Sequence, residues 1–259
     1  MIDLSTSLQD LLLSHTGYGI GNEHPNQVKT IVIGNESGTG GRETEDYVHR
    51  LFNHISDEPS FVKAKSPQRK STFLQFINRL RLYSEAKDVK WFSYKHELSS
   101  SDYERILGES CLSNSETHTT NFHLLDIRPL PRPSENSPLP YAGLDAKLYL
   151  KAFNSFDVNH ATYGSWVEKR REKLLAKIDS FDSLTTIIAA GNISMKMAFL
   201  SGLYPEAQFT LHNLSSGKPC YIAEVTSNKR KIKLLATHFF DNKSGIKLQG
   251  LKEVAELIY

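Results

Sequence analysis

Three polar residues stand where an apolar, β-branched run gives way to a glycine-rich loop. The run Ile31–Ile33 stops at Gly34 and is followed by Asn35, Glu36 and Ser37. Such a run is typical of a strand buried in a parallel sheet, and ligands of open α/β sheets bind just beyond the carboxyl ends of such strands. A carboxylate or an amide at that place could orient a water molecule. A glycine-rich turn without a ligand would fit this segment equally well.

Two further apolar runs also end in residues that could do chemistry. Phe122–Ile127 contains Asp126 and is followed by Arg128, and Lys233–Thr237 is followed by His238. If these runs are parallel neighbours in one sheet, two carboxylates and an imidazole converge on a single edge. Each residue also has a structural interpretation, because a carboxylate can cap a turn and a histidine can be satisfied within a core.

The elements that must position these residues alternate along the chain. Apolar runs predict four core strands, at 31–33, Phe122–Ile127, Leu184–Ala190 and Lys233–Thr237. Helical periodicity predicts helices between them, at Ser5–Ser14, Thr44–Ile55, from Thr72, Tyr103–Leu107, Leu144–Asn154, Tyr163–Ile178, Ser194–Leu203 and Leu248–Ile258. A pair of shorter strands is predicted at Phe209–His212 and Cys220–Val225. This order predicts a single α/β domain with a four-stranded, mainly parallel central sheet and helices on both faces.

Two smaller features admit both a structural and a functional interpretation. Trp91, Phe92 and Tyr94 form an aromatic group that could pack in the core or stack on a ligand. The basic residues of the helix at Tyr163–Ile178, which include Arg170, are typical of a solvated face.

Composition excludes several classes of protein. The chain has 259 residues, a net charge of +2 and two cysteines, without a C-x-x-C pattern. A disulfide framework, a zinc ribbon and an iron–sulfur cluster are therefore not expected, and we predict no metal and no cofactor. Phosphate-loop and dinucleotide-binding signatures are absent, which argues against a nucleotide-binding enzyme. Without a leader or a membrane-spanning run, we expect a cytoplasmic monomer that does not enter membranes.

These segments together resemble the uracil-DNA glycosylase superfamily. The resemblance depends on Gly34-Asn35-Glu36-Ser37-Gly38 after the first strand, on R-P after the second, on I-I-A-A-G-N-I-S-M at 187–195, and on His238 after the last. It covers most of the chain, but its motifs are short. Ser37 and Phe239 stand where the superfamily usually has prolines, and the four cysteines of its iron–sulfur members are absent.

The resemblance implies a role for each residue of these motifs. Glu36 would orient or activate water, with Asn35 as the alternative, and His238 would stabilise charge on the departing base. Asp126, Ser37 and Gly38 would recognise the base. The DNA-binding residues it implies are Arg128, Phe239, Phe240, Asn242, Lys243 and Ser244, with one of the two phenylalanines wedged into the duplex.

Asp126 predicts which base is removed. Uracil-excising relatives have an asparagine at this place, whose amide can both donate to O4 and accept from N3–H. A carboxylate only accepts, so it would repel O4 of uracil but suit the N4 amino group of cytosine. Because excision of ordinary cytosine would damage the host genome, we expect a modified cytosine in double-stranded DNA, such as the glucosylated hydroxymethylcytosine of phage DNA. A uracil or mismatch repair glycosylase, a non-catalytic module for modified DNA and a nucleotide-binding protein remain alternatives.

Overall fold

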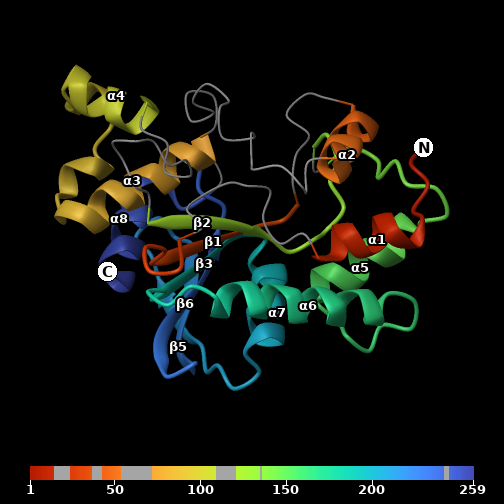
Figure 1. Ribbon diagram of the computed structural model, residues 1–259. Helices are drawn as coiled ribbons and strands as arrows, with labels where there is room; N and C mark the ends of the chain where they lie inside the picture. The colour runs from red at the N-terminus through yellow and green to blue at the C-terminus, as the bar shows by residue number, and fades with distance from the viewer. Residues whose placement is uncertain (15–23, 37–42, 54–71, 109–120, 135, 242–244) are drawn as a thin grey trace.

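One mixed β-sheet forms the centre of the computed structural model, which describes residues 1–14, 24–36, 43–53, 72–108, 121–134, 136–241 and 245–259 (Figure 1). Within these ranges the strands are β1 (Thr30–Gly34), β2 (Phe122–Asp126), β3 (Thr186–Gly191), β4 (Thr210–Asn213), β5 (Pro219–Ser227) and β6 (Arg230–His238). Their order in the sheet is β2-β1-β3-β6-β5-β4.

The strands β2, β1, β3 and β6 run parallel to one another. They correspond to the four core strands predicted from the sequence, and their carboxyl ends lie along one edge of the sheet. Gly34 lies opposite Asp126 in the β1–β2 register, and Gly191 lies opposite His238 in the β3–β6 register. The parallel topology therefore brings the ends of all four strands together.

The central sheet has more strands than predicted, because the two shorter strands expected at Phe209–His212 and Cys220–Val225, here β4 and β5, belong to the same sheet. The antiparallel pairing of β5 with β6 runs from Cys220–Thr237 to Ser227–Arg230, and β4 pairs antiparallel with β5 at the outer edge. Asn228 and Lys229 close the β5–β6 hairpin with positive φ angles of 48° and 63°. Two successive positive φ angles are the geometry that a two-residue hairpin turn requires. The described sheet is consequently six-stranded and mixed.

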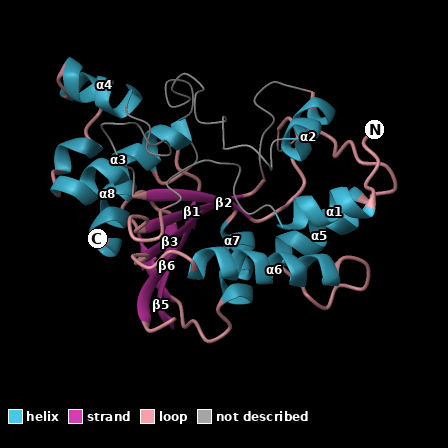
Figure 2. Cartoon of the chain, viewed as in Figure 1, coloured by secondary structure: helices cyan, strands magenta, loops and turns pink. Residues whose placement is uncertain are grey.

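Helices cover both faces of this sheet (Figures 1 and 2). The α-helices are α1 (Thr6–Ser14), α2 (Thr44–Asn53), α3 (Thr72–Ala86), α4 (Ser100–Gly108), α5 (Ala146–Ser155), α6 (Gly164–Asp179), α7 (Ile193–Leu203) and α8 (Lys247–Ile258), and the 3-10 helices are η3 (Val89–Phe92) and η4 (Lys95–Glu97). The first core cluster joins α1, α5, α6 and α7 to one face, and the second joins α3, α4 and α8 to the other.

The central strand β1 contributes to both clusters. Ile31 and Ile33 belong to the first and Val32 to the second, as the alternation of side chains along a strand requires. All three side chains are fully buried. In the ranges described, no helix combines the length and the apolar composition needed to cross a membrane.

Candidate functional site

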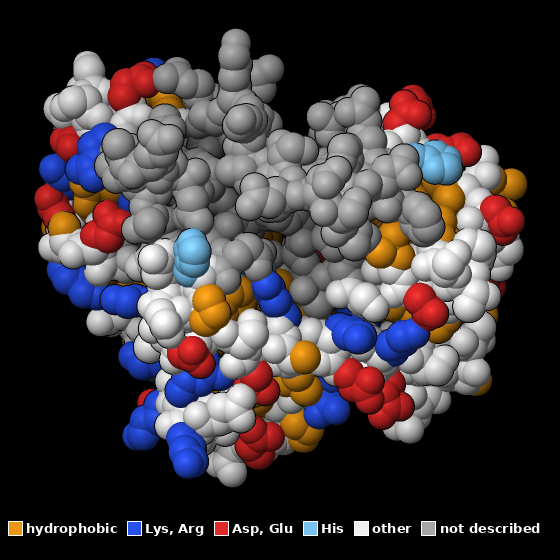
Figure 3. All heavy atoms as spheres, viewed as in Figure 1, with side chains coloured by type: hydrophobic (Ala, Val, Ile, Leu, Met, Phe, Trp, Pro, Cys, Tyr) orange, Lys and Arg blue, Asp and Glu red, His pale blue; other side chains and the backbone are white. Residues whose placement is uncertain are grey.

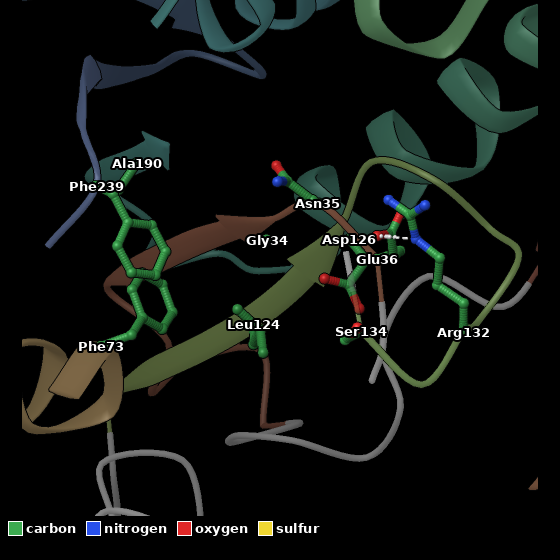
Figure 4. Close-up of a pocket in the computed structure, with 10 residues that line it drawn as sticks. All are labelled: Gly34, Asn35, Glu36, Phe73, Leu124, Asp126, Arg132, Ser134, Ala190 and Phe239. Carbon is green, nitrogen blue, oxygen red and sulfur yellow. Dashed lines mark hydrogen bonds and ion pairs between the residues drawn. The ribbon is translucent and has the colours of Figure 1, made fainter. Parts of the chain in front are cut away.

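A cavity of about 230 Å³ lies at the carboxyl ends of β1 and β2 (Figure 4). Its polar lining comes from Asn35, Glu36, Asp126, Arg132 and Ser134. Three of these, Asn35, Glu36 and Asp126, belong to the residues that the sequence analysis placed at the strand ends. The cavity thus lies where the sheet topology predicts a ligand site.

Gly34 allows Asp126 to reach the cavity. The Asp126 carboxylate lies over the last residue of β1, so a Cβ atom at Gly34 would collide with Oδ1 of Asp126. The Asp126 side chain, packed over β1 at this register position, therefore leaves no room for a Cβ atom at residue 34. Asp126 is buried and turns a hydrogen-bond acceptor toward the cavity (Figure 4).

Two arginines hold the Glu36 carboxylate. Nε of Arg128 lies 2.7 Å from Oε2, and Nε of Arg132 donates to Oε1 at 2.6 Å. The exposed fractions of the three side chains are only 5% for Glu36, 3% for Arg128 and 6% for Arg132. Main-chain N–H of Arg128 also donates to the carbonyl oxygen of Asn35 at 2.7 Å. These contacts fasten the proline-rich loop after β2 to the end of β1.

This pairing bears on two of the predicted roles. With both oxygens bound to guanidinium groups, Glu36 is a poor base for a water molecule, and its contacts suit a structural anchor. Asn35, the alternative named from the sequence, lines the cavity next to it. Arg128 was predicted to bind DNA, but its side chain is buried and paired with Glu36. Arg132, which the sequence analysis did not single out, is the arginine that lines the cavity.

Two buried cations fix the strand ends from the face that α6 and α7 cover. Nζ of Lys196 donates to the carbonyl oxygens of Ile33 at 3.1 Å and Gly34 at 3.0 Å. Arg170 donates from Nη2 to the carbonyl oxygen of Asp126 at 2.6 Å. Both side chains are fully buried, so Arg170 does not belong to a solvated face as predicted. Because they satisfy the last carbonyl groups of β1 and β2, they hold Asn35 and Asp126 in place.

The apolar part of the cavity contains two stacked rings. Phe73, near the start of α3, and Phe239, directly after β6, line the cavity together with Leu124 and Ala190. The ring centroids of Phe73 and Phe239 are 5.2 Å apart and the ring planes differ by 15°. In Figure 4 this pair lies across the cavity from Asp126, Ser134 and Arg132. A flat, partly polar ligand would meet both kinds of surface.

The structure corrects one aromatic prediction, that for Phe240, and decides between the two interpretations that the sequence left open for Trp91 and Phe92. Phe240 is fully buried and its ring lies 6.3 Å from that of Phe76, so it cannot act as a wedge at the surface. Trp91 and Phe92 are also buried in the core beside α3, and exposed Tyr94 does not line the cavity. Phe239 differs from these, because 46% of it is exposed. Phe73 belongs to the helix predicted from Thr72, and its position in the cavity depends on tertiary packing.

His238 lies on the same sheet edge, but it is not among the described residues that line the cavity. It is half-buried, and its pKa is lowered from 6.5, first by desolvation and then by the charge of Lys218. The imidazole is therefore neutral at pH 7 and carries one N–H donor. Ser37, Gly38, Asn242, Lys243 and Ser244 lie outside the described residues, so their predicted roles stay predictions.

Charged side chains of both signs are mixed over the described part of the face seen in Figure 3. The described residues contain no group of three His, Cys, Asp or Glu side chains that could bind a metal ion. Searches of protein-family models, curated proteins and solved structures found no match to the chain.

Proposed function

We propose that this protein is a DNA glycosylase that flips a modified cytosine out of the duplex and hydrolyses its N-glycosidic bond. The observation that carries the proposal is the Asp126 carboxylate at the polar side of a cavity whose other side is aromatic. Arg170 holds the main-chain carbonyl oxygen of Asp126, and Gly34 leaves room for its carboxylate. A nucleobase has the matching surfaces, namely two apolar faces and a polar edge.

Asp126 supports a cytosine-type base. Its carboxylate accepts hydrogen bonds and would pair with the N4 amino group, whereas O4 of uracil would face it as a second acceptor. The burial of Asp126 increases this discrimination. If O4 of uracil faced the buried carboxylate, both groups would lose their water without gaining a hydrogen bond. The further restriction to modified cytosine, including the glucosylated form, comes from the family resemblance and from the need to spare host DNA.

The reaction adds water across the bond between the base and deoxyribose. In this proposal the side-chain carbonyl of Asn35 accepts a hydrogen bond from the attacking water and aims it at C1′. The N1–C1′ bond breaks, its electron pair stays on the base, and the proton that water loses neutralises the base. His238 donates a hydrogen bond to O2 while this charge develops, and a donor of this kind lowers a barrier by about 2.7–4 kcal/mol.

Glu36 acts indirectly in the proposal. Its two ion pairs fix Arg132 beside the cavity and join the proline-rich loop to β1. In this proposal Phe239 enters the duplex where the base has left, and its 46% exposure supports this role.

An abasic-site assay tests the proposal. Duplexes that differ only in one base (uracil, cytosine, 5-hydroxymethylcytosine or its glucosylated form) are incubated with the protein and treated with alkali. We expect the wild-type protein to produce strand breaks at a modified cytosine. The Asn35→Ala variant, assayed separately at the same concentration, should produce none. Breaks at uracil alone would identify a repair glycosylase and contradict the role of Asp126. Binding of the modified duplex without breaks would identify a non-catalytic reader, and no breaks on any duplex would refute the glycosylase proposal.

A further inference from the structure

We propose that the flipped base stacks on Phe73 and takes the place that the ring of Phe239 occupies there. The inference rests on the proposed function and adds two points to it. It names the aromatic surface that binds the base, and it makes entry of the base and departure of Phe239 a single exchange.

The geometry of the pair suits such an exchange. The Phe239 ring lies nearly parallel to that of Phe73, with 5.2 Å between centroids and 15° between planes. This arrangement is the offset stacking that a pyrimidine ring also adopts on an aromatic side chain. Both rings line the cavity that contains Asp126, and in Figure 4 Asp126 lies to one side of the pair. A base in the plane of the Phe239 ring would therefore turn an edge toward the carboxylate.

The two rings differ in how firmly they are held. Phe73 belongs to α3, and its ring also stacks on fully buried Phe240 at 5.9 Å. Phe239 lies outside any helix or strand and has 46% of its surface exposed. Its main chain is fixed, since its carbonyl oxygen accepts hydrogen bonds from the N–H groups of Asp241 and Ile246, both at 3.2 Å. Phe239 can thus leave by rotation of its side chain alone, while Phe73 stays in position.

The exchange keeps the apolar face of Phe73 covered in both states. Before DNA binds, Phe239 covers it, and afterwards the base does. The Phe239 ring, released at the moment when the base leaves the duplex, is then available to fill the space between the neighbouring base pairs. A base that enters the cavity must therefore displace Phe239, whatever the DNA sequence around that base.

Two leucine variants separate these roles when each is measured on a duplex and on the matching single strand. Phe73→Leu removes the stacking surface and should lower kcat/KM on both substrates by similar factors, about 5- to 150-fold from the usual strength of base–aromatic stacking. Phe239→Leu should be slower on the duplex, where a wedge is needed. On the single strand it should match or exceed the wild type, because the ring that competes for Phe73 is gone. Tyr94→Leu, which removes an exposed ring outside the cavity, should leave both rates unchanged.

Phe73→Tyr keeps the ring and should retain activity, which separates stacking from folding. If Phe73→Leu does not fold, Phe73→Met tests the same loss of the ring with a more flexible side chain. Wild-type rates on both substrates for a folded Phe73→Leu or Phe73→Met would overturn the inference and leave the glycosylase proposal intact. Equal losses for Phe239→Leu on duplex and single strand would overturn the exchange. A wild-type protein that cleaves neither substrate would refute the proposed function and the inference together.

Discussion

Replacement of Glu36 by glutamine is the perturbation for which the structure gives the clearest magnitude. The substitution keeps the shape of the side chain but removes the negative charge between Arg128 and Arg132. All three side chains are at most 6% exposed, so water cannot replace the lost partner. Removal of one partner of a buried ion pair costs about 3–5 kcal/mol, because it leaves a charge buried without compensation. We expect Glu36→Gln to lower the free energy of unfolding by this amount.

Glu85→Gln provides a matched control. Glu85 pairs with Arg81 at 2.7 Å, close to the 2.6 Å between Glu36 and Arg132, but 43% of the Glu85 side chain is exposed. Its loss should cost only about 0–1 kcal/mol, as for other exposed ion pairs. Both substitutions remove a carboxylate charge at nearly the same distance from a guanidinium group. Glu36 loses two ion pairs in buried surroundings, whereas Glu85 loses its ion pair with Arg81 at the surface.

Urea denaturation followed by tryptophan fluorescence measures both changes. The account predicts a clear shift of the midpoint for Glu36→Gln, with an unchanged slope, and a small shift for Glu85→Gln. Equal, small losses of stability would refute the buried anchor. In that case Glu36 would again be available as the group that activates water.

Three more predictions follow from individual contacts. Gly34→Ala should displace the carboxylate of Asp126 and cost about 1–3 kcal/mol of stability, as overpacking does, so an unaltered urea midpoint together with full excision would contradict the close approach. The imidazole of His238 should titrate below pH 6.5 in an NMR measurement. Because the unfolded chain binds the imidazole proton more tightly than the folded protein, the free energy of unfolding should fall as the pH drops from 6.5 through the lowered pKa. His238→Gln should remove the part of this fall that comes from His238. Burial raises the pKa of the Cys220 thiol to about 11, so in a Cys111→Ser variant a thiol reagent at neutral pH should react only after unfolding, and rapid reaction of the folded protein would be inconsistent with this burial.

The parallel part of the sheet was predictable because its strands are short β-branched or apolar runs that end abruptly. Ile31–Ile33 before Gly34 is such a run, and its burial on both faces follows from its place between β2 and β3. The antiparallel extension was not predictable in the same way. The β5–β6 turn consists of Asn228 and Lys229 without a glycine, and lysine rarely adopts a positive φ angle. The sequence therefore predicted strands at Cys220–Val225 and Lys233–Thr237 but not the hairpin that joins them and continues the sheet.

The site was predictable as far as strand topology determines it. Asn35 and Asp126 each lie at or next to the end of a core strand, so parallel neighbours must bring them together. The partners of Glu36 depend on how the loop after β2 folds back, and Arg132 lies 96 residues away in the chain. Phe73 likewise reaches the cavity only through the packing of α3. Spacing in the sequence carries no information about such contacts.

The most direct test of the account is the base preference of Asp126→Asn. The wild type should excise the modified cytosine and leave uracil untouched in an otherwise identical duplex. An amide can donate to O4, so the variant should lose much of its activity on the modified cytosine and gain activity on uracil. The ratio of the two single-turnover rates should therefore move toward uracil. An unchanged ratio, measured with a variant whose urea midpoint equals that of the wild type, would contradict the claim that Asp126 selects the base.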